Sequence, residues 1–289
     1  MLGLAGIALI FVTVFGGYLA SGGKMAIILK SLPYEFIIIG GAAIGSFVIG
    51  SDKGGIAHAA KDVSKVFKGP TWRPADYKDL LCLLYELIDV ARKDVVALET
   101  HLDDPRESDI FARYPKILAD NDAIELICDT LRSGLMNFDD ANQVDEVLER
   151  RLEARVKEAL HSSHALQSMA DGLPALGIVA AVLGVIKTMG SIDQPPEILG
   201  GLIGGALVGT FLGVFLAYGL VGPFAIRIRD VVLNDSNYYK VIREVLVANL
   251  REHSANVCLE IGRQNIPGHL RPNFPEVDEA IRDLKRAAR

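Results

Sequence analysis

The sequence predicts an all-α membrane protein, with four transmembrane helices and a helical cytoplasmic domain. Half of the 289 residues are hydrophobic although 23% are charged, and the mean hydropathy is +0.29. Four apolar segments approach or exceed the length that crosses a membrane. The polar remainder shows helical periodicity and no alternating strand pattern of any length.

The candidate spans form two pairs: 2–20 with 36–50, and 173–189 with 198–226. The second is short for a span, and the fourth is long enough to cross with a tilt or a bend. The first segment resembles a secretory signal peptide, but it lacks a basic amino-terminal region and its apolar run is longer than usual. We therefore expect a retained span.

The polar sequence falls into two blocks. We expect a transmembrane hairpin at 1–50, a cytoplasmic helical domain at 51–172, a second hairpin at 173–226 and a cytoplasmic helical region at 227–289. Excess positive charge marks the cytoplasmic side of a membrane protein, which places both blocks in the cytoplasm of a multi-pass protein of the bacterial inner membrane. The basic residues that follow the second and fourth spans are Lys53, Lys61, Lys65, Lys68, Arg227 and Arg229.

Amphipathic periodicity predicts one helix over residues 76–102. Arg92 and Glu99 are seven residues apart and would share one face of it. A charged face is most often only solvated, so the residues alone leave a partner-binding role open. Further helices are expected at 138–170, 227–262 and 277–287.

No motif for catalysis, phosphate binding or metal binding occurs in the sequence. Cys82, Cys128 and Cys258 fall in the polar blocks without CxxC spacing, which indicates reduced structural thiols. The net charge of -6 gives no indication of nucleic-acid binding. We expect neither enzymatic activity nor a cofactor.

Glycine recurs every four residues in the fourth span, at Gly201, Gly205, Gly209 and Gly213. Such a row is typical of tight association between membrane helices. It fits packing within this chain and packing against other copies or a partner equally well, because both use the missing side chain.

We expect no carboxylate in the middle of a span. Glu35 and Lys187 lie near span ends, where long side chains reach the interface. Ion-transporting proteins normally carry an intramembrane carboxylate, so either this chain moves no ions or a partner supplies the group. Thr210 is polar and near mid-span: its hydroxyl either bonds back to a carbonyl one turn earlier or lines an ion path.

Two prolines mark the cytoplasmic ends of the third and fourth spans. Pro174 is expected at the first helical position, where its missing N–H removes no hydrogen bond. Pro223 falls inside a continuing helical pattern and should kink it. The sequence thus predicts two bend points at one depth.

Five segments, in order along nearly the whole chain, resemble the MotA family of flagellar motor stator subunits, within the wider MotA/TolQ/ExbB proton channel family. ExbB-like and TolQ-like relatives have three spans, so four spans and the "DPRES" stretch favour the MotA branch. The segments are "TVFGGYLASGG" (13–23), "GGAAIGSFVIG" (40–50), "DPRESDIFARYPKILAD" (104–120), "LPALGIVAAVLGVI" (173–186) and "VGTFLGVFLAYGLVGP" (208–223).

The resemblance implies a ring of five copies in membrane lipid around two copies of a MotB-like single-span partner, whose transmembrane Asp supplies the carboxylate. It implies proton flow that drives torque on the rotor protein FliG. The alternatives are an ExbB/TolQ-type energiser of an outer-membrane system and a non-conducting scaffold for a cell-wall-anchored partner.

The family's coupling prolines correspond to Pro174 and Pro223, and its ion-path threonine to Thr210. Sodium-driven relatives carry a threonine seven residues after the first proline, where this chain has Ala181. Sodium needs several coordinating oxygens, so the resemblance favours the proton over sodium.

The family's rotor-contacting cation and anion correspond to Arg92 and Glu99. Arg92 is displaced by one residue relative to "DPRES", so Lys93 is an alternative to it. If a partner helix packs against the third span, Gly177, Ala180 and Gly184 would give it a smooth surface.

Overall fold

The computed structural model describes residues 2–50, 53–135 and 140–287, and every regular element among them is a helix. The all-α prediction is therefore confirmed for this part of the chain. Two compact units are present: an apolar unit of Met1–Gly69 with Ala159–Val231, and a charged unit of Pro70–Glu158 with Val232–Arg289. Helices cross the segment boundaries expected at 172/173 and 226/227.

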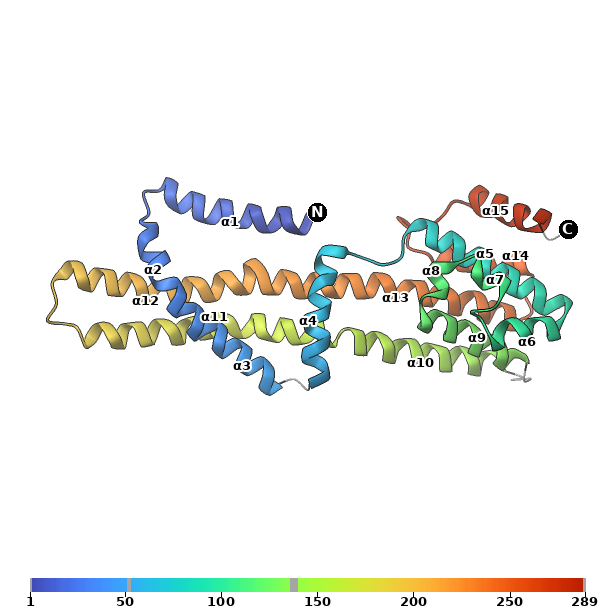
Figure 1. The fold of residues 1–289 in the computed structure, drawn as a ribbon, viewed down its shortest axis with the longest axis horizontal. Coiled ribbons are helices and arrows are strands. Elements are labelled where there is room, and N and C mark those ends of the chain that lie inside the picture. Colours follow the sequence, from blue (N-terminus) through green and yellow to red (C-terminus); the bar gives the residue numbers. More distant parts are fainter. Residues whose placement is uncertain (1, 51–52, 136–139, 288–289) are drawn as a thin grey trace. The chain divides into compact units, whose positions relative to one another are not determined.

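The apolar unit contains the membrane spans. Four helices in the described residues are long and apolar enough to cross a membrane. In Figure 1, α2 and α3 lie across the paired α11 and α12. The elements are α1 (Leu2–Ala20), α2 (Met25–Glu35), the π-helix η1 (Phe36–Gly40), α3 (Gly41–Gly50), α4 (Lys53–Lys68), α11 (His161–Met189), α12 (Pro196–Leu216), the π-helix η2 (Ala217–Val221) and the first turns of α13 (Gly222–Leu250).

The second span is longer than expected. It runs over Met25–Gly50 instead of 36–50, because the helix continues past Pro33 and through the π turn η1. Glu35 therefore lies near the middle of a candidate span. The expectation that no carboxylate occupies such a position is wrong.

Pro174 lies well inside α11 and not at its first position. The polar residues before it remain helical, so its missing N–H removes a bond to the carbonyl four residues earlier. Pro223 lies inside a continuing helix, as predicted, and is the second residue after the π turn η2.

The two prolines do not share one depth. A Cβ placed on Gly213 would lie 2.6 Å from the carbonyl oxygen of Leu173, which puts Pro174 level with Gly213. The Ser163 hydroxyl donates to the carbonyl of Ala225 at 2.8 Å, which puts Pro223 level with the start of α11. At 1.5 Å per residue the prolines are roughly 14 Å apart along the helix pair.

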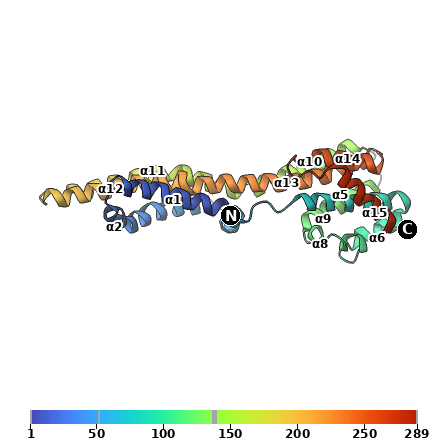
Figure 2. The same ribbon diagram turned by 90° about the horizontal axis from the view of Figure 1, so that it is seen from above.

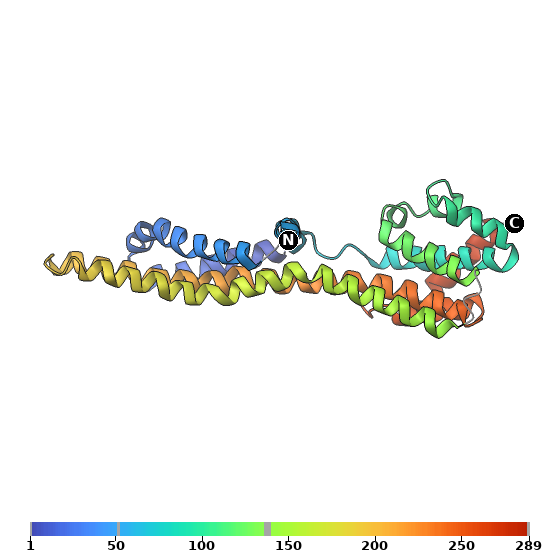
Figure 3. The same cartoon turned by 90° about the horizontal axis from the view of Figure 1, so that it is seen from below.

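The charged unit packs around an apolar core. The core includes Tyr77, Phe111 and Tyr238, each fully buried. α15 lies against α5 (Figure 2), and α10 lies along α13 (Figure 3), where Arg243 pairs with Asp145. Besides the rest of α13, the helices are α5 (Pro74–Lys93), α6 (Val95–Asp103), α7 (Asp109–Ala112), α8 (Pro115–Leu118), α9 (Asn121–Leu135), α10 (Ala141–Ala159), α14 (Ala255–Asn265) and α15 (Phe274–Ala287).

The helix expected over 76–102 is broken at Asp94. Asp94 is extended, with φ -152° and ψ 102°, and its carboxylate accepts from the N–H groups of Val96 and Ala97 at 3.0 and 3.1 Å. Asp94 therefore caps a new helix. Arg92 and Glu99 lie on different helices, so the argument that they share one face is wrong.

The helix expected over 227–262 is also interrupted. α13 ends at Leu250, Glu252 has a positive φ of 61°, and α14 begins at Ala255. The last helix begins at Phe274, three residues before the expected start.

Removal of the Asp94 cap should loosen α6. Asp94→Ala loses both acceptor contacts, which typically costs about 1 kcal/mol, so amide hydrogens in residues 95–103 should exchange several-fold faster. Hydrogen exchange followed by mass spectrometry measures this. Asp94→Ser keeps a capping oxygen without the charge and should exchange like the parent; parent-like exchange in Asp94→Ala would contradict the capping role.

Candidate functional site

The seam between α11 and α12 is packed at backbone distance. A Cβ on Gly177 would lie 2.9 Å from the carbonyl oxygen of Gly209, and one on Gly184 would lie 2.5 Å from the Cβ of Ala206. Real Cβ atoms do not approach other atoms this closely, so any residue other than glycine at these positions would force neighbouring atoms to move. The seam fixes the register of the two helices.

The glycine row of α12 mostly serves packing within the chain. Gly213 faces α11, Gly209 faces α11 and Glu35, and Gly205 faces the Ser31 hydroxyl of α2. A Cβ on Gly201 would meet no atom of the described residues within 4 Å. Only the outermost glycine of the row is therefore open to another molecule.

The smooth surface expected on α11 is already covered. Gly177 and Gly184 face α12, and Ala180 is 1% exposed. The expectation that these residues receive a partner helix is wrong. The free face of α11 is instead an apolar stripe, 49–61% exposed, made of Ile178, Val182, Val185, Ile186 and Met189.

Three of the four predicted ion-path residues lie together. The Cα of Thr210 would be 3.3 Å from a Cβ on Gly177, one turn from Pro174, and the backbone N of Ala181 would be 3.3 Å from a Cβ on Gly209. Pro223 lies apart, beyond η2.

The hydroxyl of Thr210 differs from those of the other threonines in the described spans. Thr13 and Thr188 donate to carbonyls four residues earlier, at 2.7 and 2.9 Å. No such bond is present for Thr210 among the described residues. Its hydroxyl is thus available to other groups.

The sequence placed Glu35 near a span end, with its side chain reaching the interface, and that expectation is wrong. Glu35 is 7% exposed, and its Oε2 has no hydrogen-bond partner in the described part of the chain. A Cβ on Gly209 would lie 2.7 Å from that oxygen. The apolar run before Pro33, "MAIIL", is the signal that could have extended the span and placed Glu35 within it.

In the charged unit, Arg92 is held by its own chain. Its guanidinium donates to Oδ1 of Asn249 at 3.1 Å and to the carbonyl of His253, so it ties α5 to the end of α13 and to the turn that follows. Lys93 is 71% exposed and pairs with Asp89 one turn earlier, and that hydrogen bond raises the pKa of Lys93. Glu99 is exposed and makes no ion pair within the described residues.

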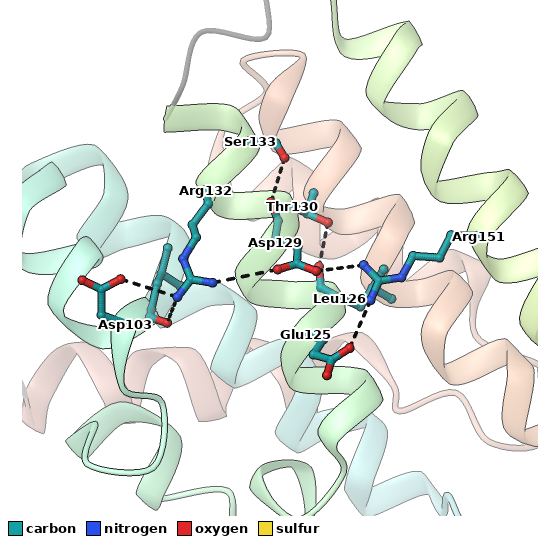
Figure 4. A network of polar contacts seen from close by, with 9 residues as sticks. Asp103, Glu125, Leu126, Asp129, Thr130, Arg132, Ser133 and Arg151 are labelled. Carbon is teal, nitrogen blue, oxygen red and sulfur yellow. Dashed lines mark hydrogen bonds and ion pairs between the residues drawn. The ribbon is translucent and has the colours of Figure 1, made fainter.

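An ion-pair network braces the helix that carries Glu99 (Figure 4). Arg132 of α9 pairs with Asp103 at the end of α6 and with Asp129. Arg151 of α10 pairs with Asp129 and Glu125. These pairs tie α6, α9 and α10 together, although each exposed pair contributes at most about 1 kcal/mol.

The cysteines are free and buried, as predicted. Burial raises the pKa of Cys82 and of Cys128 to about 11, so both are thiols and poor nucleophiles. No group of three or more metal-binding side chains occurs among the described residues.

Two family models match the chain. The motility protein A N-terminal model matches residues 4–95, and the model of the MotA/TolQ/ExbB proton channel family matches residues 122–240. Motility protein A of Escherichia coli (strain K12) is 38% identical, over 99% of this chain and 96% of the relative. Chemotaxis protein LafT of Vibrio parahaemolyticus is 34% identical, over 95% of this chain and 96% of the relative.

Solved structures share the fold. The MotAB structure from C. jejuni has a TM-score of 0.72 at 19% identity and covers 92% of this chain and 95% of the matched chain. The flagellar MotAB stator complex from Bacillus subtilis has a TM-score of 0.71 at 21% identity, covering 95% and 99%.

An added methyl group should destabilise the protein at Gly213 but not at Gly201. Gly213→Ala places a Cβ against the carbonyl of Leu173, and overpacking typically costs about 1–3 kcal/mol, so we expect less folded protein and a lower melting temperature in detergent. Gly201→Ala meets no atom of the described residues within 4 Å and gains up to about 1 kcal/mol of helix propensity, so it serves as the matched control. Equal stability of the two variants would contradict the packed seam.

Proposed function

Because this chain belongs to the MotA family of flagellar stator subunits, we propose that it couples proton flow across the bacterial inner membrane to torque on the rotor protein FliG. It does so with further copies of itself, five in a ring, and with a MotB-like single-span partner. The observation that supports this most is the 38% identity to a motility protein A over 99% of the chain. Both polar blocks face the cytoplasm in this proposal.

The partner's Asp remains necessary in this arrangement. Glu35 is enclosed by its own chain, whereas the partner's carboxylate must reach a free surface. The apolar stripe of α11 offers such a surface, and Thr210 offers a hydroxyl without an internal bond. The α1 helix, whose span is 0% buried, faces lipid.

The ion is the proton. Ala181 lies beside the Gly209–Thr210 turn, where a threonine would add a second hydroxyl for sodium coordination. With alanine there, few oxygens surround the site. A proton needs only one oxygen that can take it up.

Proton transfer supplies enough free energy to bias a movement. Each proton releases about 2.3 kcal/mol per 100 mV of membrane potential. Neutralising the partner's Asp changes which packing of the ring is favoured. The continuous helix Pro196–Leu250 carries the change from the path at Thr210 past Pro223 to the charged unit.

The charges offered to the rotor are Lys93 and Glu99. Both side chains are exposed, and Lys93 is bound only to Asp89 of its own helix. Arg92 is committed to the end of α13, which supports Lys93 as the rotor-facing cation.

Expression of this chain with its MotB-like partner should restore swimming to a strain that lacks its own stator. The speed should fall when a protonophore removes the proton gradient and should not change when potassium replaces sodium. Replacing the partner's transmembrane Asp by Asn is the control and should abolish swimming. A speed that follows external sodium would overturn the ion assignment, and an immotile strain with well-formed complex would overturn the stator function.

Substitution of Lys93 and of Arg92 should show which of the two contacts the rotor. Lys93→Glu should reduce swimming with an unchanged amount of complex, because it reverses an exposed charge and removes only a surface ion pair with Asp89, which contributes little to stability. Arg92→Ala should lower the amount or thermal stability of the complex, because it removes the hydrogen bonds that tie α5 to the end of α13 and the turn after it. Swimming assays and quantitative immunoblots measure both effects. Normal swimming of Lys93→Glu, with immotile but fully stable Arg92→Ala, would assign the rotor contact to Arg92.

A further inference from the structure

Two polar side chains of α2 pack against the glycine row of α12. Ser31 and Glu35 are one turn apart on α2, and they face Gly205 and Gly209, one turn apart on α12. A Cβ on Gly205 would lie 2.8 Å from the Oγ of Ser31, and one on Gly209 would lie 2.7 Å from the Oε2 of Glu35. Each polar group occupies the space that a missing side chain leaves.

Packing does not explain the carboxyl group of Glu35. The residue is 7% exposed, its Oε2 has no hydrogen-bond donor, and no Lys or Arg pairs with it in the described residues. Burial of an unpaired polar group costs free energy that an apolar side chain would avoid. Ionisable groups inside a span are rare and generally mark ion or proton routes.

The row leads from an open end to the middle of the span. Gly201, one turn before Gly205, has no neighbour within 4 Å of its Cβ position. The starts of α2 and α12 follow the short connections on the side opposite the polar blocks. From that side the order is Gly201, then Ser31 at Gly205, then Glu35 at Gly209, and then Thr210.

The helix around Glu35 is also irregular. Pro33 lies two residues before it and the π turn η1 begins at Phe36 directly after it. Single π turns inside helices occur frequently at functional sites.

We propose that Ser31 and Glu35 form the outer half of the proton path. A proton enters beside Gly201, passes the Ser31 hydroxyl and binds the carboxylate of Glu35. It then leaves toward Thr210 and from there reaches the partner's Asp. A hydronium ion of the outer solution gives up the proton, the carboxyl O–H bond of Glu35 forms and then breaks, and an O–H bond forms on the partner's Asp, so Glu35 returns to its starting state. This inference rests on the proposed function, because it requires a proton-conducting complex.

The test is proton flux into lipid vesicles that contain the complex of the full chain with its MotB-like partner. A potassium gradient with valinomycin sets the potential, and an enclosed pH-sensitive dye reports the flux. Glu35→Gln keeps the shape but cannot accept the proton, so its flux should be at least about tenfold lower, in line with the loss of a positioned proton-transfer group. Glu35→Asp should restore most of the flux, which a purely structural role would not predict.

Two serine variants complete the comparison. Ser31→Ala should lower the flux several-fold, whereas Ser46→Ala, which removes an exposed hydroxyl from α3, should leave it unchanged. Parent-like flux through Glu35→Gln overturns the role of Glu35 alone. No flux through the parent complex overturns the proposed function, and the inference with it. If Glu35→Gln does not assemble, the Ser31→Ala flux decides: a reduction supports the path and parent-like flux overturns it.

Discussion

Backbone contact between α11 and α12 is the constraint on which the apolar unit depends. Lipid tails are as apolar as the helices they surround, so membrane helices associate through close packing and not through hydrophobic burial. Here the packing rests on Gly177, Gly184 and Gly213, where one added methyl would meet a backbone atom or an alanine Cβ within 2.9 Å. The register that follows sets Thr210 opposite Gly177 and Ala181 beside Gly209. The geometry of the site is thus a consequence of absent side chains.

The same glycine row serves two neighbours because of helix geometry. Residues four apart on a helix with 3.6 residues per turn are rotated by about 40° from one another, so the row from Gly201 to Gly213 sweeps about a third of the circumference. It begins on an open face, reaches α2 at Gly205, faces α2 and α11 together at Gly209 and ends against α11 at Gly213. Because its direction changes along the helix, one glycine row can pack against α11 at one end and contact the polar side chains of α2 nearer the other.

Hydropathy and periodicity were sufficient for the all-α class, the number of spans and the position of Pro223 inside a helix, because these depend on composition averaged over many residues. Hydropathy and periodicity gave wrong expectations where the structure depends on a single residue or contact. Lys30 and Pro33 interrupt the apolar run, which moved the expected start of the second span past Glu35. Polar sequence precedes Pro174, and hydropathy alone does not show whether that sequence is already helical. A proline at the start of a helix therefore cannot be distinguished from one inside it at this position. The acceptors of Arg92 lie 157 and 161 residues away, beyond any local pattern.

The magnitudes restrict how the proposed motor can work. One proton releases about 2.3 kcal/mol per 100 mV, which is similar to the typical cost of about 1–3 kcal/mol for one strained methyl in a packed core. Separation of the seam would lose several close contacts at once, so in the proposed mechanism α11 and α12 move as one pair. The glycine contacts at backbone distance end near Leu173 and Gly213. Beyond them a Cβ on Gly222 would be 3.9 Å from that of Ala170, and the helices are joined by the side chain of Ser163, which donates to the carbonyl of Ala225. The π turn η2 and Pro223 lie in this stretch, where side chains and not glycine backbones make the contacts. In the proposed mechanism Pro174 therefore belongs to the rigid pair at the ion path, and Pro223 to the point where its movement passes into α13.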